Sequence, residues 1–468
     1  MNNFRFSKII AWVGPTLAKE TVLSKVINMV DVFRVSLSGG FDDNNKKYID
    51  TIMKLDNSKT IMLETRGADI RVKNVMDVKV REKQLVEVEY SEYAQEHEKK
   101  IFLDAPFIRE LRIGQQIKFQ QSGVVVKVKK IQPTGILAEV TQWGRVAQFD
   151  RALFPNYEYA IPFLGERDKK DILWGLEYGV HIIASSLTKS KNDILELRQF
   201  LATKNADKLK ILAKIENKEG LQHFKEILDS ADGIILIFDK IDKLIKETKW
   251  TEELLVQECK KMGKPIIITF VGKSDGKHYL LVNESQAKKF CALGADAYMI
   301  DTMLGEDDPL EMITELSEIL DKYELKIAEK DLSRFYENNE FLVRDYIIYN
   351  SYRATKEVLV RAVVSYTENW YSAARLSSLA PRVPVIAFTK NDETYRYLNM
   401  LRWVRGYKIS QSFSYENLKR VGKEMIRIIF KWNISLDDKI IIMQANESLS
   451  DEKSGMINGL ELYKFKNI

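Results

Sequence analysis

Eight short, strongly apolar segments recur along the 468-residue chain, and stretches with helical periodicity lie between most of them. Segments of this length that are rich in β-branched residues are typical of buried strands, whereas apolar residues three and four positions apart are typical of amphipathic helices. Eight strands that alternate with helices predict a TIM (β/α)8 barrel, although a doubly wound open sheet would show the same alternation. The eight segments are KIIAWV (8–13), VFRVSL (32–37), TIMLE (60–64), HIIAS (181–185), KILAKIE (210–216), GIILIF (233–238), PIIITF (265–270) and DAYMI (296–300).

A long gap between the third and fourth of these strands predicts an inserted domain. VKVREKQLVEVEY, IGQQIKF, VVVKVKKI and GILAEVTQW alternate like antiparallel strands, and Gln-Ser-Gly and Pro-Thr-Gly mark turns between them. After residue 323 a helical stretch leads to AVVSYT, VPVIAFT, GYKIS and KIIIMQ, with helices between. We therefore expect barrel segments at 1–71 and 161–338, a small inserted β domain at 72–160 and a C-terminal α/β domain at 339–468.

The composition excludes several classes of protein. The net charge of +5 comes from 72 basic and 67 acidic residues that are spread along the chain, so no nucleic-acid partner is expected. No apolar run approaches the ~20 residues that a membrane span needs, and the first residues do not resemble a signal peptide. Cys259 and Cys291 both lie in helix-like patterns, so we expect buried thiols rather than a disulfide. These features favour a cytoplasmic protein.

Charged and hydroxyl residues gather where the predicted strands end. In TIM barrels these ends form the active site. Carboxylates among several cations and hydroxyls suit an anionic, oxygen-rich ligand with a divalent ion, since Mg²⁺ takes one or two carboxylates and completes its shell with water and phosphate. A simple ion-pair network at the mouth of the barrel is the alternative. The residues are Arg34, Ser36, Ser38, Glu64, Thr65, Arg66, Ser185, Ser186, Lys214, Glu216, Asp239 and Thr269.

The pair Lys214 and Glu216 bears directly on whether these residues bind a ligand or form an ion-pair network. The two residues lie two positions apart at the end of a strand, so their side chains point to the same face. Burying an ammonium and a carboxylate costs several kcal/mol unless each has a partner. Either the two side chains pair with each other at a solvated rim, or they hold a ligand.

Several blocks of the sequence resemble pyruvate kinase, and together they span essentially the whole chain. The most specific is KIENKEG within AKIENKEG; the others are KIIAWVGPTL, FRVSLSGG, ETRGADIR, ADGIIL and SYTENWYSAARLSSLAPRVPVIAFTKND. The resemblance implies a TIM barrel with a mobile β-barrel lid after the third strand and a C-terminal α/β domain. It also implies transfer of a phosphoryl group from phosphoenolpyruvate to ADP, giving pyruvate and ATP in glycolysis. Mg²⁺ or Mn²⁺ would be the cofactor, often with K⁺, in a homo-oligomer (a tetramer or a dimer).

The resemblance also assigns roles to matching residues. Lys214 matches the lysine that bridges the phosphoryl group and the enolate oxygen, and Arg34 matches an arginine that contacts the phosphoryl group. Arg71 matches an arginine that contacts the nucleotide phosphates.

The resemblance implies two cation sites as well. Glu216 matches a ligand of the divalent metal. Ser38 and Thr65 match ligands of the monovalent cation, and Glu64 stands where the family has an aspartate ligand.

This chain departs from the family pattern at several of these places. After the sixth strand the family has Ala-Arg-Gly-Asp-Leu-Gly, whose Asp is the second metal ligand, whereas IFDKIDKL aligns Lys240 there and offers Asp239 one residue earlier. The family threonine that helps to protonate the enolate aligns with Phe270, and Thr269 lies one residue before it. The Asp-Asp-Gly turn of the lid reads Gln-Ser-Gly, so its carboxylate is missing.

The effector loop of the family is altered too, because Trp370 replaces a glycine in TENWYSA. We expect this indole to fill the pocket for a sugar bisphosphate and to prevent activation by that ligand.

These departures leave two hypotheses. The first is a pyruvate kinase, impaired by the changes, in which Lys214, Arg34, Glu216, Asp239 and Thr269 carry the reaction. The second is a catalytically inactive paralogue that serves as a structural or partner-binding protein. It predicts exposed apolar or aromatic patches, for instance around Trp370 and Tyr371.

Overall fold

The computed structural model describes residues 5–37, 43–155, 157, 161–271, 273–274, 279–280, 283–301, 308–326, 343–410, 415–431, 433–444 and 459–468. Within these ranges the side chains of 239, 240, 271, 273, 274, 279, 280, 301, 343 and 415 lie outside the description. The chain forms two compact units. The first contains Lys170–Ile468 and the described residues before Arg66, and the second is Arg66–Lys169.

The first unit contains a closed barrel of eight parallel strands. Their order around the barrel is β1-β18-β15-β14-β13-β12-β3-β2. Each strand coincides with one of the eight segments expected from the sequence, so the TIM barrel is confirmed and the open sheet is excluded. The strands are β1 (Lys8–Trp12), β2 (Val32–Ser36), β3 (Thr60–Glu64), β12 (Ile182–Ser185), β13 (Lys210–Ile215), β14 (Gly233–Ile237), β15 (Ile266–Val271) and β18 (Ala297–Asp301).

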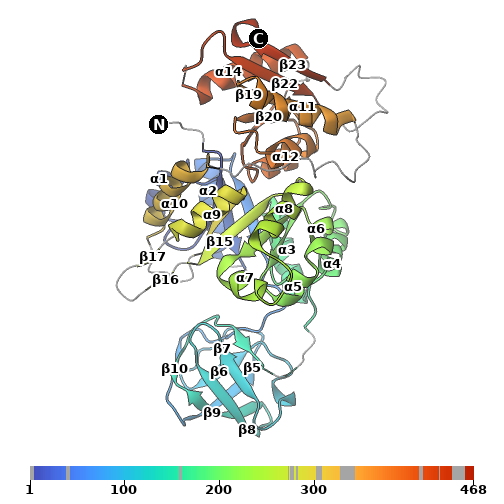
Figure 1. Ribbon diagram of the computed structural model, residues 1–468. Coiled ribbons are helices and arrows are strands. Elements are labelled where there is room, and N and C mark those ends of the chain that lie inside the picture. Colours follow the sequence, from blue (N-terminus) through green and yellow to red (C-terminus); the bar gives the residue numbers. More distant parts are fainter. Residues whose placement is uncertain are drawn as a thin grey trace. The chain divides into compact units, whose positions relative to one another are not determined.

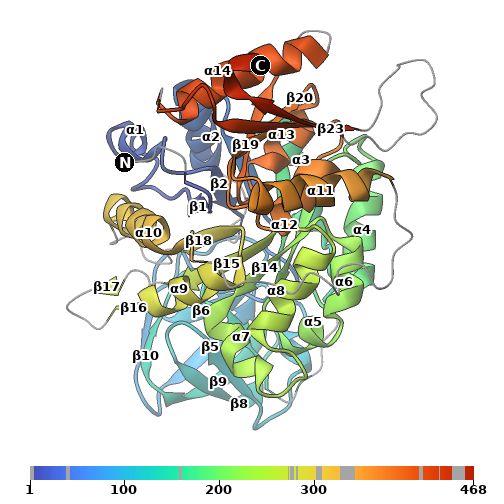
Figure 2. The same ribbon diagram turned by 45° about the horizontal axis from the view of Figure 1, so that its top comes forward.

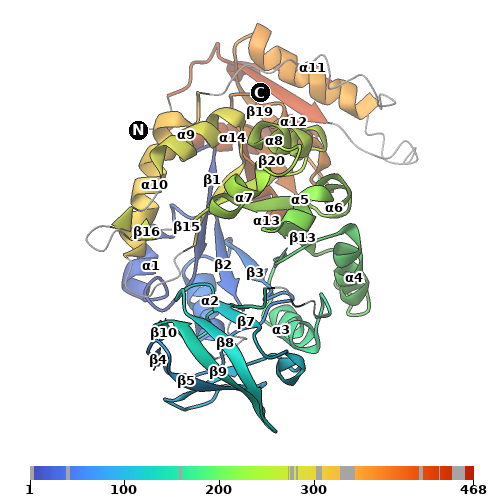
Figure 3. The same cartoon turned by 60° about the horizontal axis from the view of Figure 1, so that its bottom comes forward.

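Helices surround these strands (Figure 3). Helix α4 shows why they form: Ser190 and Asp193 make a capping box, and Ile194, Leu197 and Leu201 make one buried apolar face. The helices are α1 (Glu20–Val26), α2 (Asp43–Leu55), α3 (Glu166–Glu177), α4 (Lys191–Ala202), α5 (Lys218–Gln222), α6 (Phe224–Ser230), α7 (Phe238–Ile245), α8 (Glu252–Lys261), α9 (Glu284–Leu293) and α10 (Pro309–Tyr323). A short hairpin, β16 (Lys273–Ser274) and β17 (Tyr279–Leu280), follows β15.

Alternation along the strands decides which side chains face the barrel interior. Val32, Met62, Leu212 and Ile267, each from a different barrel strand, belong to one buried apolar cluster, which continues into the C-terminal sheet. We infer that these four side chains face the barrel interior. Side chains two positions further along a strand point the same way. At the carboxyl ends of the strands this rule places Arg34, Glu64, Lys214 and Thr269 on the interior face.

The second unit is built around a six-stranded sheet in the order β11-β7-β8-β9-β5-β6, which Figure 1 shows as a curled sheet. Its buried apolar side chains form one core cluster. A two-stranded sheet of β10 and β4 accompanies it. All pairs are antiparallel except β5 with β6. The strands are β4 (Val78–Val80), β5 (Leu85–Tyr90), β6 (Lys100–Leu103), β7 (Gln116–Phe119), β8 (Val125–Ile131), β9 (Gly135–Gln142), β10 (Gly144–Val146) and β11 (Ala152–Leu153), with a 3₁₀ turn η1 (Ile108–Glu110). This curled sheet confirms the inserted β domain.

A five-stranded mixed sheet completes the first unit, in the order β21-β20-β19-β22-β23. β23 is antiparallel to β22 and the other pairs are parallel. α11 and α14 lie on opposite faces of this sheet (Figure 2). The elements are α11 (Val343–Glu357), β19 (Val360–Tyr366), α12 (Tyr371–Ser378), β20 (Val385–Thr389), α13 (Asp392–Leu398), β21 (Val404–Lys408), α14 (Tyr415–Ile429), β22 (Lys439–Gln444), β23 (Gly459–Lys464) and η3 (Phe465–Asn467). The C-terminal α/β fold is thus confirmed, whereas the residue limits of the domains stay predictions.

Hydrogen bonds join this C-terminal segment to residues at the amino ends of barrel strands. Tyr397 Oη donates to the Asp232 carbonyl oxygen at 2.6 Å, just before β14. Asn399 Nδ2 donates to Thr60 Oγ1 at 3.0 Å, at the start of β3. The Arg402 amide donates to Asp296 Oδ1 at 3.3 Å, just before β18. The carboxyl ends of the strands, where the predicted site lies, are at the opposite end of the barrel.

Two further expectations concern the whole chain. Cys259 and Cys291 are both free and buried, as expected. Among the described helices, none is long and apolar enough to cross a membrane.

Candidate functional site

Three charged side chains from three strands meet inside the carboxyl end of the barrel. Arg34 Nη1 on β2 donates to Glu64 Oε2 at 2.6 Å. Lys214 Nζ on β13 donates to Glu64 Oε1 at 2.8 Å. Both oxygens of one carboxylate therefore accept a hydrogen bond from a cation, and we call this arrangement the Arg34–Glu64–Lys214 bridge.

Burial makes the bridge electrostatically strong. Arg34 is 2% exposed, Lys214 5% and Glu64 6%. Burial alone would raise the pKa of Glu64, but the Arg34 guanidinium and the Lys214 ammonium outweigh it and lower the pKa from 4.5 to about 2. Glu64 is therefore ionised at neutral pH, and it holds two cationic groups side by side at the barrel mouth.

The question raised by Lys214 and Glu216 now has an answer. The structure pairs Lys214 with Glu64 on β3. Glu216 is half-buried, and its Oε1 accepts a hydrogen bond from the Leu187 amide at 3.3 Å. Leu187 has a left-handed φ of 58°, a conformation that costs energy in a leucine and that recurs at functional sites. The turn after β12 thus directs an amide at Glu216.

Thr65, which follows Glu64, has internal partners as well. Its Oγ1 accepts a hydrogen bond from the Ser186 amide at 3.1 Å and donates to the Ala184 carbonyl oxygen at 3.4 Å. These contacts tie the end of β3 to the end of β12 and fix the direction in which Glu64 leaves the strand.

Thr269 lies inside the barrel, as its position two residues after Ile267 requires. Its side chain is fully buried, and Oγ1 has no hydrogen-bond partner among the described residues. Phe270 points to the other face, where its ring stacks on Tyr298 at a centroid distance of 6.0 Å. The hydroxyl that precedes the expected position therefore faces the interior, and the aligned phenylalanine does not.

Two predicted site residues lie outside what the structure describes. Ser38 is one of them. The side chain of Asp239 is the other, although its backbone belongs to α7, which starts at Phe238 directly after β14. Among the described residues, no group of three or more histidine, cysteine, aspartate and glutamate side chains could hold a metal ion.

Arg71 belongs to the second unit and takes part in an ion-pair network there. Its Nη2 lies 2.9 Å from Asp69 Oδ2, and its Nη1 donates to the Phe149 carbonyl oxygen at 3.1 Å. Arg151 Nε binds the other oxygen of Asp69 at 2.7 Å. The predicted phosphate contact of Arg71 remains a prediction.

A second cluster in this unit was not predicted from the sequence. The carboxylate of Asp104 pairs with Arg66 and lies 3.6 Å from Lys73 Nζ. Burial lowers the pKa of Lys73 to about 8, although Asp104 opposes the shift. Arg66 lies in the motif ETRGADIR and was among the residues predicted for the site, but neither Lys73 nor Asp104 belongs to a recognisable motif.

The Gln-Ser-Gly turn of the second unit binds a carboxylate from elsewhere in that unit. The amides of Gln121 and Ser122 donate to Asp150 Oδ1 at 2.8 Å and Oδ2 at 3.0 Å. Asp150 is fully buried. It therefore stabilises the turn and does not offer a ligand group in place of the missing carboxylate.

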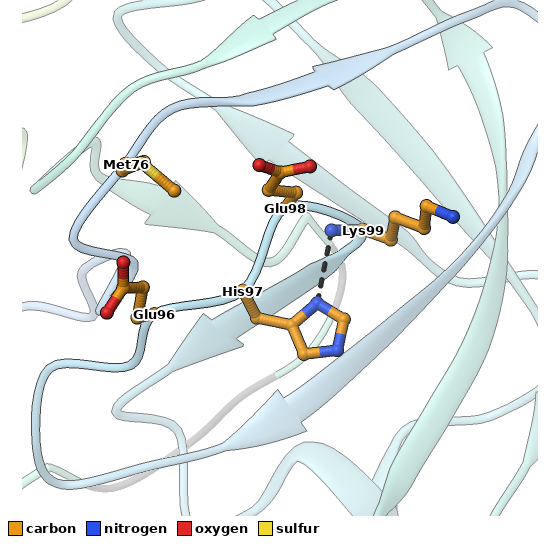
Figure 4. Close-up of a pocket in the computed structure, with 5 residues that line it drawn as sticks. All are labelled: Met76, Glu96, His97, Glu98 and Lys99. Carbon is orange, nitrogen blue, oxygen red and sulfur yellow. Dashed lines mark hydrogen bonds between the residues drawn. The ribbon is translucent and has the colours of Figure 1, made fainter.

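A shallow pocket of about 360 Å³ on the second unit is lined by Met76, Glu96, His97, Glu98 and Lys99 (Figure 4). His97 Nδ1 accepts a hydrogen bond from the Lys99 amide at 3.1 Å, and the lining carboxylates are exposed. None of the predicted site residues lines this pocket, and its groups do not converge on a common point. We assign it no role.

That Trp370 fills an effector pocket stays a prediction, and the structure gives this residue contacts of another kind. It caps α12 with a left-handed φ of 67°, and its ring lies 5.0 Å from that of Tyr397. Lys210, the first residue of β13, lies over the Trp370 ring at 5.1 Å. Trp370 and Tyr371 are both half-buried, so the indole joins the C-terminal segment to the amino end of a barrel strand.

The comparisons with known proteins agree with this architecture. A family model described as pyruvate kinase, barrel domain, matches residues 4–271, and one described as pyruvate kinase, alpha/beta domain, matches residues 345–461. A pyruvate kinase of Staphylococcus saprophyticus is 26% identical over 412 residues, which cover 84% of this chain and 70% of that protein. One from Staphylococcus aureus strain MRSA252 is 26% identical over 417 residues, covering 85% and 70%. With a barrel, an inserted sheet and a C-terminal sheet that match in order, the chain belongs to the pyruvate kinase family.

Proposed function

We propose that this chain transfers the phosphoryl group of phosphoenolpyruvate to ADP, giving pyruvate and ATP. The observation that carries the proposal is the Arg34–Glu64–Lys214 bridge, which holds a guanidinium and an ammonium together at the buried carboxyl end of a TIM barrel. Phosphoryl transfer needs little covalent help from the protein and depends on positioned positive charge. Membership of the pyruvate kinase family supports the same reaction.

The bridge gives each cation a role. Arg34 presents a planar set of donors that suits the oxygens of a phosphoryl group. Lys214 presents a compact charge that would lie between the phosphoryl group and the enolate oxygen. Glu64 fixes the Arg34 guanidinium and the Lys214 ammonium before the substrate arrives. These groups therefore need to move little when charge shifts from the phosphoryl donor to the nucleotide.

A divalent ion fits the site through Glu216. Its half-buried carboxylate lies at the carboxyl end of β13, and Mg²⁺ or Mn²⁺ needs few protein ligands when phosphates and water complete the shell. We propose Glu216 as one ligand and Asp239 as the second. When bound, the ion would neutralise charge on the transferring phosphoryl group.

Thr269 is the proposed source of the proton that converts the enolate into pyruvate. It is buried and faces the barrel interior. Its hydroxyl oxygen has no partner among the described residues. The nucleotide phosphates would contact Arg71. The chain would act in the cytoplasm as a homo-oligomer, and we propose the domain limits 1–71, 72–160, 161–338 and 339–468.

The test is ADP-dependent formation of pyruvate by the purified chain, followed by ³¹P NMR with and without Mg²⁺. Lys214→Met should lower turnover by at least about 10²-fold, the typical effect of losing one positioned charge. Lys218→Met is the matched control, because Lys218 is exposed in the same motif and pairs with exposed Glu247. Absence of turnover at high protein concentration, together with absence of ADP binding, would reject the proposal.

The inactive-paralogue hypothesis finds no specific support. It predicts exposed apolar or aromatic patches, for instance around Trp370 and Tyr371, and both of these residues are half-buried. Tyr371 Oη also donates to Asp345 Oδ1 at 2.7 Å within the C-terminal segment.

A further inference from the structure

The bridge occupies the position where the family resemblance places a monovalent-cation ligand. Glu64 Oε2 lies 2.6 Å from Arg34 Nη1, and Oε1 lies 2.8 Å from Lys214 Nζ. Each oxygen of the carboxylate already faces a positive charge at hydrogen-bonding distance. A K⁺ ion bound to the same oxygens would lie within a few ångströms of both cations, and in a buried site that repulsion is only weakly screened.

The hydroxyl of Thr65, the neighbouring member of the predicted cation site, is also engaged by hydrogen bonds. It accepts one hydrogen bond from the Ser186 amide and donates another to the Ala184 carbonyl oxygen. A cation at Thr65 Oγ1 would compete with contacts that hold β3 to β12. The side-chain oxygens of Glu64 and Thr65 are therefore already engaged by hydrogen bonds within the protein.

The identity of residue 64 explains the arrangement. The resemblance places an aspartate there, whereas glutamate is longer by one methylene group. In the barrel, β12 lies between β3 and β13, so a carboxylate from β3 must reach past one strand to meet Lys214. The longer side chain makes that reach while also meeting Arg34 on the other neighbouring strand, β2.

We infer that this chain binds no monovalent cation at Glu64, because the Arg34–Glu64–Lys214 bridge supplies the positive charge that such an ion would bring. The site is then complete without K⁺. The inference concerns the binding of an ion to the folded chain, and only its catalytic consequence rests on the proposed function.

The first experiment measures binding without activity. The thermal unfolding midpoint of the full chain is compared in KCl and in tetramethylammonium chloride at equal ionic strength, since an ion that binds the native state raises the midpoint. We expect equal midpoints for the wild-type chain and a rise in KCl for Glu64→Asp, whose shorter side chain cannot hold both cations. A wild-type rise that Glu64→Gln removes would overturn the inference. A rise that Glu64→Gln retains would place the ion elsewhere and leave Glu64 unoccupied, as inferred.

The second experiment measures turnover in the same two salts with Mg²⁺ present. Equal rates are expected. A loss of turnover in tetramethylammonium chloride that KCl restores would overturn the inference when the wild-type midpoint also rises in KCl and Glu64→Gln removes that rise. No turnover in either salt would instead reject the proposed function, and the unfolding comparison would still decide whether Glu64 binds K⁺.

Discussion

Replacing Glu64 with glutamine measures how much the buried bridge contributes to stability. The change keeps the size of the side chain but removes the negative charge beside Arg34 and Lys214. Loss of one partner from a buried ion pair costs about 3–5 kcal/mol. The lowering of the Glu64 pKa from 4.5 to about 2 gives about 3 kcal/mol, since each pKa unit is worth about 1.36 kcal/mol. We therefore expect Glu64→Gln to lower the free energy of unfolding by about 3 kcal/mol.

The pH dependence of this effect has a definite sign. Because the pKa of Glu64 is lower in the folded chain, its contribution is fully present above pH 4.5 and is lost as the pH falls from 4.5 towards 2. The stability gap between the wild-type chain and Glu64→Gln should therefore be constant from neutral pH to about pH 5 and shrink below it.

The assay is urea unfolding at a series of pH values, followed by circular dichroism and by tryptophan fluorescence. Glu247→Gln is the matched control, because Glu247 pairs with Lys218 at the surface, and we expect no measurable change from it. The reasoning would be refuted by a Glu64→Gln chain whose unfolding free energy at pH 7 lies within about 1 kcal/mol of the wild-type value.

Three further predictions address other residues. Thr269→Val should leave the free energy of unfolding unchanged or raise it by about 1 kcal/mol, because it removes a buried hydroxyl without a described partner; turnover should fall by at least about 10²-fold, and parallel losses of stability and turnover would contradict the proposed role. Burial and the Arg396 charge lower the pKa of His181 to about 4, so stability should fall by up to about 3 kcal/mol as the pH drops from 6.5 towards 4. In urea titrations His181→Gln should flatten this profile, and the exposed control His223→Gln should not. Arg402→Met should cost about 3 kcal/mol or more in urea unfolding, because Arg402 is buried and donates to the carbonyl oxygens of Cys291 and Ala295; a loss below 1 kcal/mol would show that these carbonyls find other partners.

The fold could be predicted from the sequence because each strand can be recognised within a short stretch of consecutive residues. KIIAWV, TIMLE and GIILIF are short and mostly apolar and carry β-branched residues, as buried strands do. The inserted domain could be recognised for the same reason, because apolar and polar residues alternate along its segments, whereas the barrel strands are mostly apolar. The alternation rule also placed Lys214 and Glu216 on one face without knowledge of the rest of the chain.

The partners in the site could not be predicted in the same way. Glu64 and Lys214 lie 150 positions apart, and their contact depends on strand order and side-chain length together. Sequence spacing suggested a pairing of Lys214 with Glu216 as one alternative, and the structure gives Lys214 another partner. Trp370 shows the same limit, because its contact with Lys210 depends on how the C-terminal segment meets the barrel.

The hydrogen bonds from Tyr397, Asn399 and Arg402 have a consequence for how the chain can be divided. They fix the amino ends of the barrel strands, at the end of the barrel opposite the proposed site. Cutting the chain after residue 271, where the match to the barrel family model ends, would remove β18 together with the C-terminal residues that make these hydrogen bonds. The register of β3 and β14 would then lack its anchor, and Glu64 would lose the alignment that lets one carboxylate reach two cations. The proposed reaction should therefore be tested on a chain that keeps β18 and the C-terminal segment.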